Sequence, residues 1–147
     1  MTFPETIVRD VPDCASHTIS TLIVEDDFLI LDIMTSILES WGCEVLGVGS
    51  AAEAINVIPT LPALDLIVTD IKLPGRMNGV ELVDAVRSQN TTIDPCALFM
   101  SGHEPRELTA QGVTTEDMAV LGKPFHTEDL RKALVEALAH RNMALPI

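Results

Sequence analysis

Aromatic side chains are scarce in this sequence of 147 residues, which has four phenylalanines, one tryptophan and no tyrosine. Hydrophobic residues still make up 47% of the chain, a share that is ordinary for a soluble globular protein. A core built around large rings is therefore excluded, and the core must consist of isoleucine, leucine, valine, methionine and alanine. The length is enough for one domain with a substantial core.

Basic residues are also few. Nine lysines and arginines stand against 22 aspartates and glutamates, which gives a formal net charge of -13. A surface this negative repels phosphate backbones and anionic lipids. We therefore expect the protein to bind neither nucleic acid nor membranes, whereas cations and proteins with basic patches are compatible partners.

Long apolar runs and paired cysteines are missing as well. No run approaches the roughly 18 residues of a membrane span, and the first residues, MTFPETIVRDVPD, lack the basic start and apolar block of a signal peptide. Cys14, Cys43 and Cys96 lie far apart without a CxxC pair, which favours reduced thiols. Cys43 and Cys96 fall in apolar runs and are expected in the core. Together these absences predict a cytoplasmic protein.

Short apolar runs alternate with helical patterns five times along the chain. The runs expected to be strands are 22–24, 45–48, 64–69, 96–100 and 118–121. They are continuously apolar, which is typical of a parallel sheet covered by helices on both faces and predicts an α/β fold. We expect an N-terminal extension over 1–18, one domain over 19–141 and a C-terminal tail over 142–147.

Several residues mark where the helices begin and end. Apolar residues recur with helical spacing from 30 to 41, and Gly42 is placed to end that helix. Ser50 and Glu53 form a capping-box pattern for a short helix that Pro59 ends. A helix is expected over 79–88, a short one over 104–111, and a last one with Arg141 in its final turn.

Unusual polar residues follow four of the expected strands. They are Glu25, Asp26, Asp27, Asp70, Ser101 and Lys123. In open α/β sheets, ligands bind beyond the carboxyl ends of the strands, at the point where the strand order reverses. Carboxylates that converge there repel one another and raise each other's pKa, and a hard divalent cation such as Mg²⁺ removes that repulsion. A nucleophilic aspartate beside such a cation, a lysine and a hydroxyl suits phosphoryl transfer.

The runs LIVEDD, LIVTDIKLPG, ALFMSG and LGKPF resemble the receiver domain of bacterial response regulators in two-component signalling. The resemblance covers about residues 19–141. It implies a doubly wound, five-stranded parallel sheet with the flavodoxin-like strand order 2-1-3-4-5.

The resemblance also implies roles for individual residues. Glu25 and Asp26 would hold Mg²⁺ together with Asp70 and the backbone carbonyl of Lys72. Asp70 would be the phospho-acceptor, Ser101 the hydroxyl that contacts the phosphoryl group, and Lys123 the lysine that pairs with it.

Further features bear on the switch. The resemblance implies that the Lys123–Pro124 bond is cis, an isomer that proline makes accessible. Val120 stands where the family often has an aromatic residue, so another repacking must report phosphorylation. Asp27 is expected to be a helix cap. His103 is more simply a solvent-facing loop residue than a catalytic one.

The implied function is a signalling switch. A histidine kinase or histidine phosphotransfer protein would supply the phosphoryl group, and the protein would catalyse only its own phosphorylation and slow autodephosphorylation. Output would pass through a downstream protein contacting about residues 104–141, or through phosphate shuttling, with a homodimer as one possibility.

Three alternatives have different requirements. An aspartyl-phosphate phosphatase of the haloacid dehalogenase type wants an acid two residues after the nucleophile, but position 72 is lysine. A flavodoxin needs a hydroxyl- and glycine-rich loop after its first strand, where this chain has acids that repel phosphate. A pseudo-receiver that folds and binds partners without phosphorylation remains open.

Overall fold

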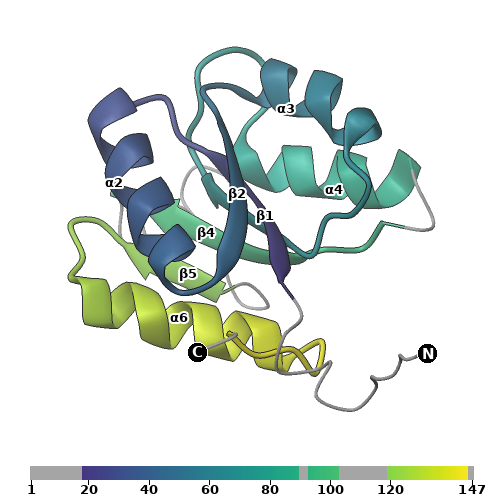
Figure 1. Cartoon of the computed structure of the whole chain (residues 1–147). Helices are drawn as coiled ribbons and strands as arrows, with labels where there is room; N and C mark the ends of the chain where they lie inside the picture. Colours follow the sequence, from purple (N-terminus) through teal and green to yellow (C-terminus); the bar gives the residue numbers. More distant parts are fainter. Residues whose placement is uncertain (1–17, 90–92, 103–118, 146–147) are drawn as a thin grey trace, which may run out of the picture.

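The computed structural model describes residues 18–89, 93–102 and 119–145. Its strands form one five-stranded sheet in the order β2-β1-β3-β4-β5, and every neighbouring pair is parallel (Figure 1). The strands are β1 (Ile19–Val24), β2 (Cys43–Val48), β3 (Leu66–Asp70), β4 (Cys96–Ser101) and β5 (Ala119–Gly122). The helical elements are α2 (Phe28–Ser40), α3 (Ala51–Val57), the 3-10 turn η2 (Ile58–Thr60), α4 (Gly79–Gln89) and α6 (Thr127–Ala139). The expected strand order and fold class are confirmed.

Helices cover both faces of the sheet, because successive residues of each strand point to opposite sides. On one face, α2 and α6 bury Met34, Leu38 and Leu134 against strand residues such as Leu98. On the other, α3 and α4 bury their own aliphatic side chains against alternate strand residues such as Ile67. Figure 1 shows the two layers, with α2 and α6 on one side and α3 and α4 on the other. The cores are almost wholly aliphatic, as the scarcity of aromatic residues requires.

Cys43 and Cys96 are buried as free thiols, as expected for core residues. Burial raises the pKa of both thiols, which keeps them protonated and unreactive. Trp41 is half-buried directly after α2, at the C-cap, and packs against the core between α2 and α6. No helix in the described part of the chain is long and apolar enough to cross a membrane.

Helix ends follow the predicted signals closely. The Asp27 side chain accepts hydrogen bonds from the first-turn amides of α2 and is its N-cap, and Gly42, with φ of 91°, takes up the left-handed conformation just beyond that helix. Ser50 caps α3 by accepting from the Glu53 amide at 3.2 Å. The Glu53 carboxylate reaches the amide of Gly49 at 2.6 Å rather than that of Ser50, so the expected capping box is shifted by one residue.

The end of α6 differs from the expectation. The helix stops at Ala139, so Arg141 lies beyond its last turn. Asn142 turns the chain with φ of 57°, and the Met143 amide returns to the Leu138 carbonyl at 2.9 Å, which closes the helix. Arg141 instead donates to Asp94 at 2.9 Å.

Smaller differences concern the limits of the strands. The third strand is Leu66–Asp70, two residues later than the expected start, and its last residue is Asp70 itself. Most of the extension over 1–18, the short helix over 104–111 and His103 lie outside the described residues.

Core packing predicts how two leucine substitutions differ. Leu98→Ala removes a fully buried side chain from the centre of the sheet and should lower the free energy of unfolding by about 3 kcal/mol. Leu29→Ala truncates a side chain that is 75% exposed and should change it by less than about 0.5 kcal/mol. Urea unfolding of both variants measures the difference, and equal losses would contradict the assigned core.

Candidate functional site

Four neighbouring strands bring the predicted site residues to one edge of the sheet. Glu25 follows β1, Asp70 ends β3 and Ser101 ends β4, while Lys123 follows β5. Because the strands are parallel and adjacent in the order β1-β3-β4-β5, their carboxyl ends meet at the same edge. The chain leaves β1 toward β2 on one side and leaves β3 toward β4 on the other, so the site lies where the strand order reverses.

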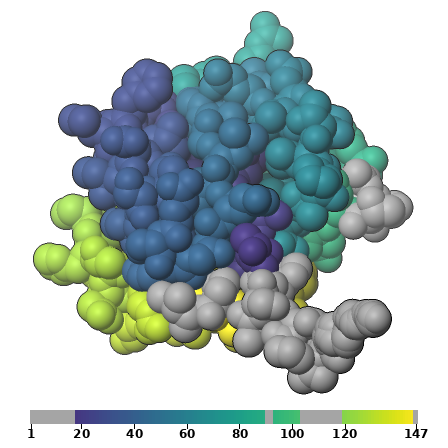
Figure 2. Space-filling view, viewed as in Figure 1, coloured from purple at the N-terminus to yellow at the C-terminus, as the bar shows by residue number. Residues whose placement is uncertain are grey.

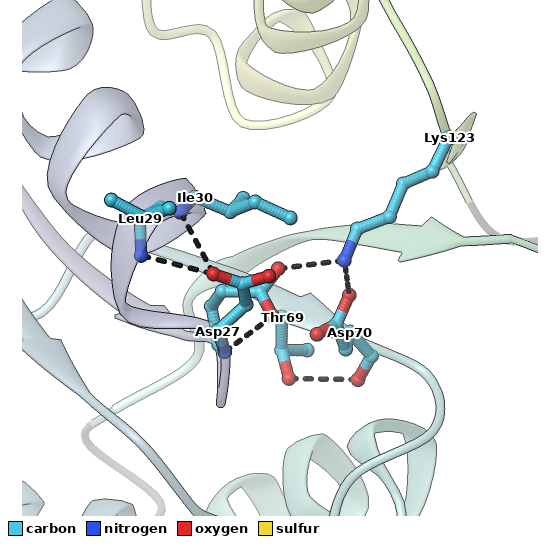
Figure 3. A network of polar contacts seen from close by, with 7 residues as sticks. Asp27, Leu29, Ile30, Thr69, Asp70 and Lys123 are labelled. Atoms are coloured by element: carbon cyan, nitrogen blue, oxygen red, sulfur yellow. Dashed lines mark hydrogen bonds and ion pairs between the residues drawn. The ribbon is translucent and has the colours of Figure 1, made fainter.

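Lys123 joins the two buried acids of this edge. Its Nζ lies 2.6 Å from Oε1 of Glu25 and 2.7 Å from Oδ1 of Asp70. Figure 3 shows the Lys123 ammonium group in contact with the Asp70 carboxylate. Glu25 is only 1% exposed and Asp70 5%, so the three groups interact in a largely dehydrated environment. This strengthens their attraction and makes their geometry specific.

The start of α2 fixes the other end of Glu25. Its Oε2 accepts a hydrogen bond from the Asp27 amide at 3.1 Å, so one oxygen is held by the backbone and the other by Lys123. The Asp27 side chain is occupied as the cap of α2, which confirms the expected cap. Figure 3 shows this carboxylate contacting the amides of Leu29 and Ile30.

The remaining acid of the run completes a set of possible metal ligands. One carboxylate oxygen from each of Glu25, Asp26 and Asp70 lies within 4.8 Å of the others. Asp26 is exposed, whereas the other two are buried. Three carboxylates beside one ammonium group leave a local excess of negative charge, and the ligands are all oxygens, so the donor set fits a hard divalent cation such as Mg²⁺. The metal role of the Lys72 carbonyl stays a prediction, as does the phosphoryl contact of the buried Ser101.

The buried acids have unusual ionisation. Burial raises the pKa of Asp70, and the hydrogen bond with Glu25 raises it further, to about 7. Burial also opposes ionisation of Glu25, but hydrogen bonds from Asp70, Lys123 and the Asp27 backbone outweigh it and lower the pKa of that carboxyl. Burial disfavours the charged form of Lys123, yet its pairing with Asp70 and Glu25 raises the pKa of that ammonium group. Lys123 is therefore a fixed cation, and Asp70 is the carboxyl that responds near neutral pH.

Two other sequence expectations concern the neighbourhood of Lys123. The Lys123–Pro124 bond is cis, as predicted. Val120 pairs in register with Phe99 on β4, and both pack against the core between the sheet and the α3/α4 layer. The aromatic side chain on this face of the β4–β5 pair is therefore on β4 rather than on β5.

Sequence reasoning missed two residues that contact the backbone of Asp70. The Thr69 hydroxyl donates to the Asp70 carbonyl at 2.9 Å, and Gly79 packs against the same carbonyl. In the sequence, Thr69 looks like one more β-branched residue of a strand, and Gly79 looks like the first residue of an ordinary helix. No local sequence pattern shows that the two meet.

The raised pKa of Asp70 predicts a dependence of stability on pH in metal-free buffer. The unfolded chain ionises this carboxyl near pH 4, but the folded protein holds the proton until about pH 7. The folded state then binds more protons between about pH 4 and 7, so the free energy of unfolding should fall as the pH rises through this range. Glu25 has the opposite effect, because its pKa is lower in the folded protein than in the unfolded chain. Its contribution to stability is present above the ordinary pKa of glutamate and is lost as the pH falls below that value.

Asp70→Asn should remove this slope and be more stable than the unsubstituted protein at about pH 8, by on the order of 1–3 kcal/mol. Urea unfolding in EDTA across the pH range measures it, with Asp84→Asn on the exposed side of α4 as the control. A slope that persists in Asp70→Asn would assign the titration to another group.

Comparison with known proteins places the chain in a family. A family model described as the response regulator receiver domain matches residues 21–135. Nodulation protein W of Bradyrhizobium diazoefficiens is 30% identical over 124 residues, which cover 84% of this chain and 52% of that protein. The transcriptional regulatory protein ZraR of Escherichia coli is 26% identical over 122 residues, covering 83% and 27%. The chain thus spans about half of the first relative and about a quarter of the second.

Solved structures agree with this match. A response regulator receiver protein from Sinorhizobium medicae has a TM-score of 0.71 and 28% identity, covering 85% of this chain and 98% of that one. The chemotaxis response regulator CheY4 of Vibrio cholerae has a TM-score of 0.70 and 27% identity, covering 83% and 100%. Since the family match takes in four strand ends with their acids, serine and lysine, this chain belongs to the response regulator receiver domains of two-component signalling.

Proposed function

We propose that the protein is a phosphorylation-dependent switch that accepts a phosphoryl group on Asp70, in the presence of Mg²⁺, from a histidine kinase or histidine phosphotransfer protein. The observation that carries the proposal is the contact of 2.7 Å between Lys123 Nζ and Asp70 Oδ1, beside two further carboxylates suited to a divalent cation. An acceptor of this type would act in the cytoplasm, where its buried thiols stay reduced.

The transfer is an in-line displacement at phosphorus. An Asp70 oxygen forms the new O–P bond while the N–P bond of the phosphohistidine breaks, and the electron pair stays on the departing imidazole. Catalysis of such a transfer is mostly positioning and charge stabilisation. Mg²⁺ held by Glu25, Asp26 and Asp70 would supply positive charge for the phosphoryl oxygens. Lys123 can exchange its contact with Asp70 for one with a phosphoryl oxygen, and the Ser101 hydroxyl can donate to another.

The proposed reaction modifies the protein itself rather than a separate substrate. Asp70 is consumed and regenerated by hydrolysis, so the protein catalyses its own phosphorylation and dephosphorylation and turns over no separate substrate. We propose that the output passes to a downstream protein that contacts β5 and α6, within about residues 104–141, or that the phosphoryl group is shuttled onward.

An exposed apolar surface lies next to the site on α2. Phe28, Leu29 and Ile33, the α2 patch, are 84%, 75% and 58% exposed. Ile33 also lines a groove of about 400 Å³ that extends to Lys123 and Phe125. Apolar surface of this kind commonly marks a protein interface. In Figure 2, α2 forms a continuous part of the visible surface.

We propose that the α2 patch docks the phosphohistidine donor. A donor protein must place its imidazole at Asp70, and the groove is lined by Lys123, the residue that contacts Asp70. Every charged side chain on α2 is an acid, so the complementary surface should combine apolar residues with lysine or arginine.

Incubation with acetyl phosphate and Mg²⁺ should add the mass of one phosphoryl group. Asp70→Asn should abolish the gain, because the nucleophile is lost, and Lys123→Ala should slow it by about 100-fold, because charge stabilisation is lost. Intact-protein mass spectrometry measures both, with Asp84→Asn as the control. Undiminished labelling of Asp70→Asn would refute the acceptor. A chain that gains no mass from either acetyl phosphate or phosphoramidate would instead be a pseudo-receiver.

The double variant Phe28→Ala/Ile33→Ala should lower the rate of transfer from a phosphorylated histidine donor by about 10-fold or more, because exposed apolar anchors are lost. Its rate with acetyl phosphate should stay unchanged. Transfer from radiolabelled histidine kinases and phosphotransfer proteins of the source genome measures the effect, and Leu46→Ala, an exposed apolar residue on the edge strand β2, is the control. Equal losses with both kinds of donor would contradict docking, as would no loss with either.

A further inference from the structure

The backbone carbonyl of Asp70 lies just beyond the pairing of β1 with β3. That pairing ends at Val24 and Thr69, whereas β3 and β4 remain paired through Asp70 and Met100. The hydroxyl of Thr69, a side chain with no exposed surface, donates to the carbonyl at 2.9 Å. Figure 3 shows this contact directly below the carboxylate that meets Lys123. A buried hydroxyl therefore holds the backbone of the acceptor at the point where strand pairing on one side stops.

Gly79 closes on the same carbonyl from the start of α4. A Cβ atom at this position would lie 2.0 Å from the Asp70 oxygen, 3.0 Å from its carbonyl carbon and 3.1 Å from Oγ1 of Thr69. The Gly79 amide also donates to the Ile71 carbonyl at 2.7 Å. Only glycine allows so close an approach of two backbone segments. The carbonyl of Asp70 is thus enclosed between Thr69 and the main chain of Gly79.

The start of α4 is itself fixed in place. The Asn78 side chain accepts from the Glu81 amide at 2.8 Å, and the Glu81 side chain accepts from the Asn78 amide at 2.9 Å, which is a complete capping box. The helix behind it buries Leu82 and Val83 in the core. Gly79 therefore cannot move away from Asp70 without moving a packed and capped helix.

We propose that Thr69 and Gly79 are positioning residues for phosphoryl transfer. They hold the main chain of Asp70 so that its carboxylate stays in contact with Lys123 and beside Glu25. This inference rests on the proposed function and adds to it two residues that contact Asp70 at its main-chain carbonyl rather than at its carboxylate. Displacement of a reacting group by about 1 Å can cost about 100-fold in rate, so the effect on transfer can be large without unfolding.

The test compares paired variants in the full chain. Thr69→Val keeps the shape but removes the hydroxyl, whereas Thr69→Ser keeps it. Gly79→Ala adds the clashing methyl group, and Gly122→Ala adds one next to Lys123 where nothing lies within 4 Å. The rate constant for phosphorylation by acetyl phosphate, the final stoichiometry of phosphoryl groups and the unfolding temperature are measured for each.

Thr69→Val should lower the rate constant by about 5- to 10-fold, and Gly79→Ala by about 10- to 100-fold, while each still reaches one phosphoryl group per chain. Thr69→Ser and Gly122→Ala should match the unsubstituted protein. A crystal structure of Thr69→Val should show a longer separation of Lys123 Nζ from Asp70 Oδ1. A purely structural role would lower stoichiometry and unfolding temperature together and leave the rate constant of the folded fraction unchanged, which would overturn the proposal.

Gly79→Ala can fail to fold, and the Thr69 pair then decides. If the unsubstituted protein is phosphorylated and Thr69→Val reacts at the same rate, the positioning role is wrong and the proposed function stands. If the unsubstituted protein gains no phosphoryl group, the proposed function itself fails, and the positioning role falls with it.

Discussion

The site depends on one ammonium group placed between two buried carboxylates. Burial removes water from Glu25 and Asp70 and so disfavours their ionised forms. The repulsion between the two carboxylates disfavours ionisation further. Lys123 offsets both with two short contacts. One positive charge cannot neutralise two acids and the neighbouring Asp26, so the cluster keeps a negative charge that a proton or a divalent cation can reduce. The same repulsion that destabilises the carboxylates in the absence of a metal therefore favours the binding of a cation.

The rest of the fold holds this cluster in place. A parallel sheet brings distant parts of the chain to one edge, and 98 residues separate Glu25 from the lysine it contacts. Aliphatic layers on both faces fix the strands. The N-terminal caps of α2 and α4 fix the loops that connect β1 to α2 and β3 to α4. The residues at the carboxyl ends of the strands therefore provide the functional groups of the site, and the strands hold their backbones in the core.

The sequence predicts the residues that provide chemistry better than those that arrange it. Glu25, Asp70, Ser101 and Lys123 are recognisable because each is a polar residue that ends a continuous apolar run, and parallel strands must align those ends. Gly79 escapes such reasoning, since its importance comes from a contact with a segment about ten residues earlier in the chain. Thr69 escapes it because a threonine at the end of a strand does not show that its hydroxyl donates to the next carbonyl. The end of α6 differs from the expectation because Asn142 turns the chain with φ of 57°, so Arg141 lies beyond the last turn, where it pairs with Asp94. Local patterns report local preferences, and tertiary contacts decide where they compete.

The scarcity of aromatic residues has a practical consequence for spectroscopy. Trp41 is the only indole and no tyrosine is present, so ultraviolet emission excited at the red edge arises from a single position. That position follows the last turn of α2, whereas the acids of the site precede its first turn. The intrinsic emission of the unlabelled protein therefore samples the packing of one helix end against the sheet, at a distance of a whole helix from the reacting carboxylate.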